Sequence, residues 1–241
     1  PQDSRFTDSF LICTPGITIR DRLRADLVAF GRQYLADPDF LIKAREGRPE
    51  DIRKCIACNQ GCIERLMLGE GKIRCALNPE TGQEIIYPQG PAGDRRNVWV
   101  VGSGPGGLTA AYEAARLGHK VTLYEKEEET GGQLRFASQA PYKDQYGVWA
   151  SWLTSQAKKI GVIVRISTEV TERMISEGNP EVVILATGGE QIKPDIPGID
   201  LSLVCHAWQV LAELHGLSFD FRKIRLHAEK DSSVVNRAVY L

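Results

Sequence analysis

Four of the six cysteines in the chain fall within one short stretch. Cys55, Cys58 and Cys62 have the spacing C-x2-C-x3-C, and Cys75 follows after twelve further residues with no histidine between them. A structural zinc site usually has two separated C-x2-C pairs, or pairs of Cys and His. Three thiolates on one tight loop with a distant fourth are instead typical of an iron–sulfur cluster. The spacing therefore favours a [4Fe–4S] cluster, with zinc or incidental thiols as the alternatives.

A glycine-rich turn follows the cysteine stretch. The apolar run 98–101 predicts a buried strand, and Gly102-x-Gly104-x-x-Gly107 then leads into a predicted helix. Glu125 ends the next predicted strand, 18 residues past Gly107. This order of strand, turn, helix and acid is the pattern of a dinucleotide site, with pyrophosphate at the helix N-terminus and ribose on the acid. A carboxylate at that position repels a 2′-phosphate, so NADP is not expected there.

Three further glycine positions could bring backbone close to a ligand. Gly132 and Gln133 lie in a second glycine turn, and Ala186 opens a third at the end of a predicted strand. Gly31 and Arg32 follow the apolar run 27–30, and Arg binds phosphate through two parallel hydrogen bonds. From the residues alone, this last pair fits a phosphate site and an ordinary strand-to-helix connection equally well.

The elements that must carry these residues alternate between strand and helix. Apolar runs at 162–166 and 181–185 predict strands, and a helical stripe covers 144–160, while a helix is expected to begin near residues 36–39. Proline and glycine punctuate 78–97, which indicates a connector between domains. We therefore expect an α/β fold with a Rossmann-like domain.

The composition restricts the class of protein. With 42% hydrophobic and 25% charged residues and a net charge of -1, nothing favours nucleic acid or an anionic membrane as a partner. No apolar run approaches the roughly 18 residues that a membrane helix needs, and crowded cysteines favour a reducing compartment. The cytoplasm is the expected location.

These motifs, in this order, resemble the NADH:flavin oxidoreductases with an old-yellow-enzyme barrel, which include 2,4-dienoyl-CoA reductase and trimethylamine dehydrogenase. The resemblance covers about residues 25–208 and implies a fragment of a larger enzyme. It divides the chain into the end of a flavin-binding TIM barrel (1–50), an iron–sulfur segment with a linker (51–96), an incomplete FAD-binding domain (97–208) and an unassigned tail (209–241).

The resemblance also implies the site residues. The FAD-binding positions would be Gly102, Gly104, Gly106, Gly107, Glu125, Gly132, Gln133, Lys143, Val170 and Ala186. Gly31 and Arg32 would hold the FMN phosphate, and the cluster ligands would be Cys55, Cys58, Cys62 and Cys75. No side chain is expected to act as a catalytic acid or base, because the substrate-binding part of the family's barrel is absent.

The function that the resemblance implies is electron transfer. NAD(P)H would reduce FAD, and electrons would pass through the [4Fe–4S] cluster to FMN, which reduces an activated alkene such as an enoate or a dienoyl thioester. The small-molecule substrate would bind on the missing barrel, and an oligomer is possible. One alternative is an amine dehydrogenase of the trimethylamine dehydrogenase type, with ADP in the nucleotide site. The other is a non-catalytic module that binds zinc and a nucleotide.

Overall fold

The computed structural model describes residues 11–12, 28–69, 71–87, 90–189, 192, 194–201, 204–206, 211 and 239–240. The chain divides into two compact units, Pro1–Gly90 and Pro91–Leu241, which we describe separately. The boundary falls inside the connector that the sequence predicts between residues 78 and 97. Most of the segment 1–24 and most of the tail 209–241 lie outside the described residues.

The first unit is built from short elements. They are β1 (Leu11–Ile12), β2 (Val28–Ala29), α1 (Arg32–Ala36), α2 (Phe40–Arg45), a 3-10 helix (Pro49–Asp51) and α3 (Ile63–Met67). β1 and β2 pair in parallel. The helix expected near residues 36–39 is α2, whereas the single-turn α1 was not predicted. Asp39 occupies the N-cap of α2 but its side chain makes no cap bond; its backbone N–H donates instead to Asp37 at 3.1 Å.

Asp37 fixes the turn between α1 and α2. Its carboxylate is buried, with 3% of the side chain exposed, and lies 2.8 Å from Lys43 Nζ. It also accepts a hydrogen bond from the backbone N–H of Arg53 at 2.9 Å. A buried carboxylate needs such partners to offset its desolvation. The contact therefore ties α1 and α2 to the chain that enters the cysteine stretch.

The second unit contains a four-stranded parallel sheet in the order β5-β4-β3-β6. Its elements are β3 (Asn97–Val101), α4 (Pro105–Arg116), β4 (Lys120–Tyr124), α5 (Leu134–Ala137), α6 (Asp144–Lys159), β5 (Ile163–Arg165), α7 (Glu172–Gly178) and β6 (Val182–Leu185). Beyond them, β7 (Cys205–His206) pairs with β8 (Val239–Tyr240). The predicted α/β class and Rossmann-like domain are confirmed.

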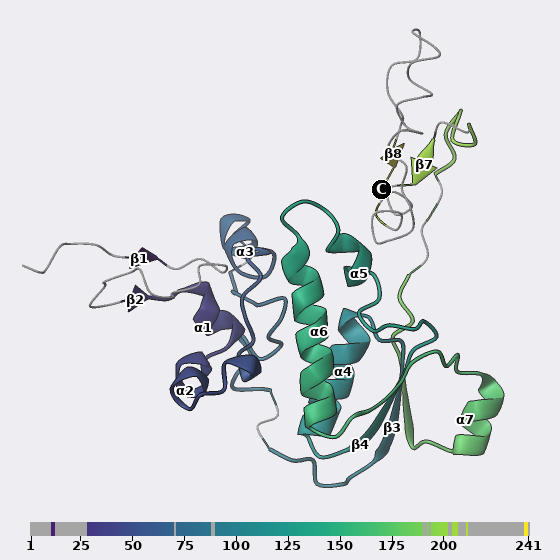
Figure 1. The fold of residues 1–241 in the computed structure, drawn as a ribbon, viewed down its shortest axis with the longest axis horizontal. Coiled ribbons are helices and arrows are strands. Elements are labelled where there is room, and N and C mark those ends of the chain that lie inside the picture. The colour runs from purple at the N-terminus through teal and green to yellow at the C-terminus, as the bar shows by residue number, and fades with distance from the viewer. Residues whose placement is uncertain are drawn as a thin grey trace, which may run out of the picture. The chain divides into compact units, whose positions relative to one another are not determined.

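Helices cover both faces of this sheet. Figure 1 shows α4 and α6 together on one side and α7 on the other. The side chains of Val100 and Leu123 are fully buried in the core. Trp99 packs against Gly178 at the end of α7, where a Cβ atom would lie 2.2 Å from the indole ring. The central strand β3 is therefore sandwiched, as expected for an apolar parallel strand.

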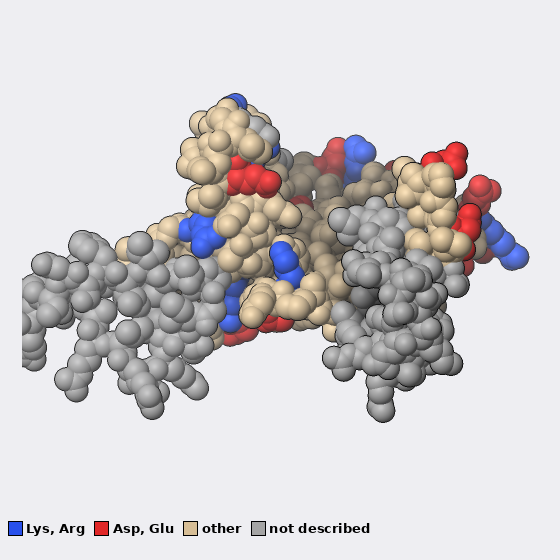
Figure 2. Space-filling model, turned by 90° about the horizontal axis from the view of Figure 1, so that it is seen from above, with Lys and Arg blue, Asp and Glu red and all other residues tan. Residues whose placement is uncertain are grey.

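The surface agrees with the near-zero net charge. In the described part of the face drawn in Figure 2, acidic and basic side chains are scattered and no continuous basic region is visible. No helix among the described residues is long and apolar enough to cross a membrane.

Candidate functional site

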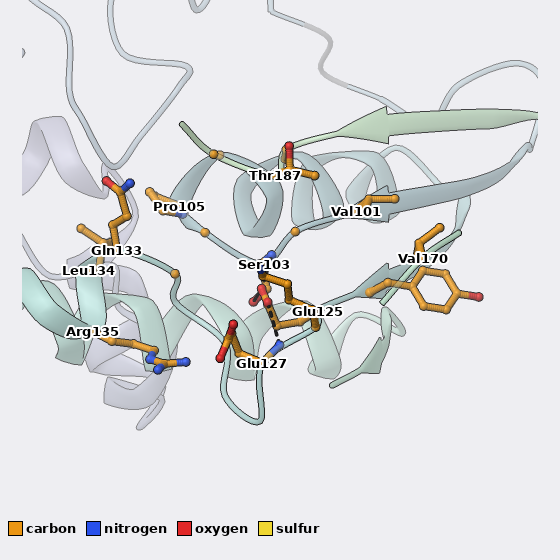
Figure 3. A pocket seen from close by; sticks show the side chains of 18 of the residues that line it. Val101, Ser103, Pro105, Glu125, Glu127, Gln133, Leu134, Arg135, Val170 and Thr187 are labelled. Carbon is orange, nitrogen blue, oxygen red and sulfur yellow. Dashed lines mark hydrogen bonds between the residues drawn. The ribbon is translucent and has the colours of Figure 1, made fainter. Parts of the chain in front are cut away.

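The second unit has a large cavity at the carboxyl ends of its strands, where ligands bind in open α/β sheets. The cavity measures about 880 Å³ and is open to solvent. Three glycine-containing turns line it, those after β3, before α5 and after β6. Figure 3 labels residues from all three turns around this cavity, among them Ser103, Gln133 and Thr187.

Close backbone packing gives this cavity its shape. A Cβ atom on Gly107 would lie 1.9 Å from the carbonyl oxygen of Gly102, so α4 can start against the turn only with glycine there. Gly102 has a φ of +100°, and a Cβ there would meet the Ala186 carbonyl oxygen at 2.3 Å. These two positions explain the glycine spacing in steric terms.

Glu125 lies at the end of β4 and is buried, with 7% exposed. Its Oε2 accepts hydrogen bonds from Ser103 N at 2.8 Å and Ser103 Oγ at 2.6 Å, and its Oε1 accepts one from Glu127 N at 3.0 Å. Burial raises the pKa of Glu125, but the hydrogen bonds from Ser103, Glu127 and Lys126 outweigh burial and lower that pKa below its ordinary value. The carboxylate is therefore charged at neutral pH.

The charged residues around the cavity mouth were not predicted from the sequence. Glu127, Glu169, Lys126 and Arg135 all line the cavity. Figure 3 shows the Arg135 side chain extending toward Glu127. The Nη1 atom of Arg135 donates a hydrogen bond to the Glu129 carbonyl oxygen at 3.3 Å. Nothing in the residue types of this segment distinguished these charges from those on an ordinary solvated loop.

The structure brings together eight of the ten positions inferred for FAD. The residues that line the cavity are Gly102, Gly104, Gly106, Glu125, Gly132, Gln133, Val170 and Ala186. Gly107 lies behind the turn and contacts Gly102, so it supports the cavity without lining it. Lys143 does not line the cavity either; it is the N-cap residue of α6, and its Nζ lies 5.3 Å from the centre of the Tyr146 ring.

Cys55, Cys58, Cys62 and Cys75 line one small cavity of about 20 Å³ in the first unit. All four thiols are free; Cys55 is buried and the other three are half-buried. Among the described residues, no three His, Cys, Asp or Glu side chains are grouped closely enough to hold one metal ion. All four donors are cysteine thiols, the ligand type of both iron–sulfur clusters and structural zinc sites.

Helix α1 holds both ends of the cysteine segment. Gln33 donates from Nε2 to the Arg53 carbonyl oxygen at 3.0 Å, and its Oε1 accepts the Cys55 N–H at 3.0 Å. The Leu35 carbonyl oxygen accepts hydrogen bonds from Asn78 Nδ2 at 3.0 Å and Thr81 Oγ1 at 2.7 Å. A short helix can therefore fix the first cysteine and the chain beyond the last one.

Arg32 lies beside the cysteines in the same unit, directly after Gly31 in the chain. Gly31 is the N-cap residue of α1, and Arg32 lines the cysteine cavity and donates a hydrogen bond to the Asn59 side chain. Asn59 has a φ of +62°, in the left-handed region that asparagine tolerates. The inferred FMN-phosphate role of this pair stays a prediction.

Burial affects the cysteines at the two ends of the segment. Desolvation raises the pKa of the Cys55 thiol, while a hydrogen bond from the Ala57 backbone and the nearby Arg32 charge oppose the shift. Desolvation likewise raises the pKa of Cys75, opposed by backbone hydrogen bonds from Leu77 and Asn78. Thiolates at these positions therefore need a compensating positive charge nearby.

Comparisons with known proteins agree with this architecture. Residues 100–163 match the family model of the NAD(P)-binding Rossmann-like domain. An NADH oxidase of Thermoanaerobacter brockii is 43% identical over 194 residues, which are 78% of this chain and 30% of that protein. A solved structure of 2-naphthoyl-CoA reductase has a TM-score of 0.71 and 36% identity, covering 76% of this chain and 28% of that one.

Amine dehydrogenases are similar as well. The structure of histamine dehydrogenase from Rhizobium sp. 4-9 has a TM-score of 0.69 and 28% identity, covering 78% of this chain and 29% of that one. The chain thus spans about 30% of the length of the curated relatives it matches. With relatives of both kinds aligned across both units, this chain belongs to the NADH:flavin oxidoreductase family related to trimethylamine dehydrogenase, whose members are flavin-dependent reductases and amine dehydrogenases.

Proposed function

We propose that the chain is the electron-transfer portion of an NAD(P)H-dependent flavin and iron–sulfur oxidoreductase that reduces an activated alkene. The observation that carries the proposal is one chain with two different sites: four free thiols around one cavity, and a nucleotide-sized cavity on a Rossmann-like sheet. The relatives supply the reaction class, because the NADH oxidase and the 2-naphthoyl-CoA reductase align with both units.

A [4Fe–4S] cluster fits the cysteine site better than zinc does. A structural zinc site usually has two separated C-x2-C pairs or pairs of Cys and His, whereas here three cysteines lie on one tight loop and the fourth follows twelve residues later. A four-iron cluster is bound by four Cys thiolates, each on a separate iron, so its ligands can be further apart. Cys55, Cys58, Cys62 and Cys75 would hold it, with Gln33 fixing the backbone of the first ligand.

The cavity of the second unit would hold the nucleotide end of FAD. The α4 N-terminus and the turn at Gly102–Gly107 would face the pyrophosphate, and Glu125 would face the ribose. The carboxylates of Glu125, Glu127 and Glu169 disfavour an added phosphate on that ribose. Cluster and flavin, when bound, supply one-electron and two-electron transfer chemistry.

An amine dehydrogenase with ADP in the same cavity is the second candidate, favoured by the likeness to histamine dehydrogenase. Gly31 and Arg32 would contact the phosphate of an FMN in either case. The substrate would bind to parts of the protein that this chain does not cover.

Anaerobic reductive titration of the purified chain after incubation with FAD would test the proposal. A chain that holds both groups takes up about three electrons, two for the flavin and one for the cluster. Uptake of about one electron with retained ADP would favour the amine dehydrogenase instead. Cys75→Ser is the matched control and should lower the uptake to that of the flavin alone. A chain that takes up no electrons after incubation would contradict the proposal.

A further inference from the structure

The carboxylate of Glu125 is nearly saturated by partners from the protein itself. A carboxylate offers about four acceptor positions, two on each oxygen. Oε2 accepts both from Ser103 N at 2.8 Å and from Ser103 Oγ at 2.6 Å. Oε1 accepts from Glu127 N at 3.0 Å. Figure 3 shows the Ser103 and Glu125 side chains pointing at each other beneath the turn that begins α4.

This arrangement limits what a nucleotide can gain from Glu125. A ribose has two neighbouring hydroxyl groups, and a free carboxylate could accept from both of them. Here Oε2 already accepts from two donors, and with the backbone donors of Glu127 and Lys126 the carboxylate has at most one acceptor position left. The second ribose hydroxyl can bind only where one of the existing donors leaves.

Among these donors, only the Ser103 hydroxyl can move away without a change in the backbone. The N–H groups of Ser103 and Glu127 belong to backbone turns, whose movement would disturb the start of α4 and the end of β4. The hydroxyl needs only a rotation about the Cα–Cβ bond. Ser103 is fully buried, so its hydroxyl loses a strong charge-assisted hydrogen bond to Glu125 when it rotates. It cannot replace that bond with one to bulk water.

We propose that Ser103 is a specificity-determining residue of the nucleotide cavity, whose hydroxyl competes with a ribose hydroxyl for Glu125. The inference rests on the proposed nucleotide role of this cavity and deepens it. Its consequence is that the cavity discriminates poorly between nucleotides with one and with two ribose hydroxyls. Removal of the Ser103 hydroxyl opens the second position on Oε2 and creates that discrimination.

Calorimetric titration of the full chain with ADP, 2′-deoxy-ADP and 3′-deoxy-ADP tests this competition. We expect Ser103→Ala to bind ADP roughly tenfold more tightly than the unaltered chain, the factor for one additional good hydrogen bond. The affinity gap between ADP and the weaker deoxy analogue should widen by the same factor. Ser103→Gly, which also lacks the hydroxyl, should behave alike, and Ser103→Thr should keep the original gap.

A double-variant cycle excludes an effect of altered folding. In a Glu125→Gln background, Ser103→Ala should change ADP affinity less than twofold, because the carboxylate is gone. The inference would be overturned if Ser103→Ala, with Glu125 retained, binds ADP no more tightly than the unaltered chain and shows the same affinity difference between ADP and the deoxy analogues. If neither the unaltered chain nor Ser103→Ala binds ADP, the nucleotide role of the cavity fails, and the inference fails with it.

Discussion

The two candidate sites are built in opposite ways. The proposed nucleotide cavity of the second unit measures about 880 Å³ and is formed where four parallel strands and their turns end. The cysteine cavity of the first unit measures about 20 Å³ and is formed by loops that one short helix fixes through side-chain hydrogen bonds. A regular sheet can hold a large ligand by backbone geometry, whereas a loop site depends on a few individual anchors.

This difference predicts where each site is fragile. In the second unit, the critical atoms are backbone atoms at glycine positions, so added side-chain volume should be the most damaging change. In the first unit, the critical atoms are the thiols and the amide that positions them, so removal of side-chain atoms should be the most damaging change.

The largest expected effect is that of Gly107→Ala. Its Cβ would lie 1.9 Å from the Gly102 carbonyl oxygen, and neither backbone can give way without moving α4 from β3. We expect a loss of about 3 kcal/mol in the free energy of unfolding, at the upper end for overpacking. Urea denaturation followed by circular dichroism measures it.

Gly104→Ala is the matched control for that variant. It has open space at the Cβ position and ordinary backbone angles, so stability should change by less than about 1 kcal/mol while ADP binding weakens. Equal stability of the two variants would contradict the steric account of the turn.

Cys75→Ser should remove the metal group from the first unit. Serine has no thiolate to close the set of four ligands, so bound iron should fall to the background level. ADP binding by the second unit should remain within about twofold of the unaltered chain. Cys205→Ser, outside the proposed ligand set, is the control and should keep its iron. Full iron content in Cys75→Ser would show that Cys75 is not a ligand of the metal group.

Gln33→Ala should loosen the cysteine segment without removing a ligand. It deletes both hydrogen bonds, to Arg53 and from Cys55, at a cost of about 1–2 kcal/mol. We expect the visible absorbance of the reconstituted chain to bleach faster in air. Gln33→Glu keeps the acceptor for the Cys55 N–H and should bleach at an intermediate rate. Identical bleaching in all three chains would show that α1 does not position the site.

The smallest effect concerns pH. The pKa of Glu125 is lowered in the folded chain from its ordinary value of 4.5, so the carboxylate contributes stability above that value and loses it as pH falls through the folded pKa. The free energy of unfolding of the unaltered chain should therefore decrease below about pH 4.5. Glu125→Gln should be less stable at pH 7 and show a shallower decrease. Parallel curves for the two chains would contradict the assignment.

The sequence predicted the second unit well because its signals are local. The apolar runs near β3, β4, β5 and β6 and the helical stripe of α6 lie within a residue or two of the observed bounds. The glycine spacing also predicted the turn at Gly102, because only glycine fits those close approaches. Ser103 was missed because the motif leaves its position unspecified, and its role appears only once β4 places Glu125 beside it.

The first unit was less predictable because its contacts are not periodic. The four cysteines were found by spacing, and the structure lines one cavity with all of them. The role of Gln33 depends on a contact over 22 residues of chain that no local pattern encodes. Lys143, inferred from resemblance, does not line the cavity of the second unit and lies at the N-cap position of α6.

The most direct test of the central claim is a metal and sulfide analysis of the anaerobically purified chain, with an electron paramagnetic resonance spectrum after reduction. The account predicts about four iron and four sulfide ions per chain, with a reduced-cluster signal that Cys75→Ser lacks. About one zinc ion per chain, with neither iron nor such a signal, would contradict it.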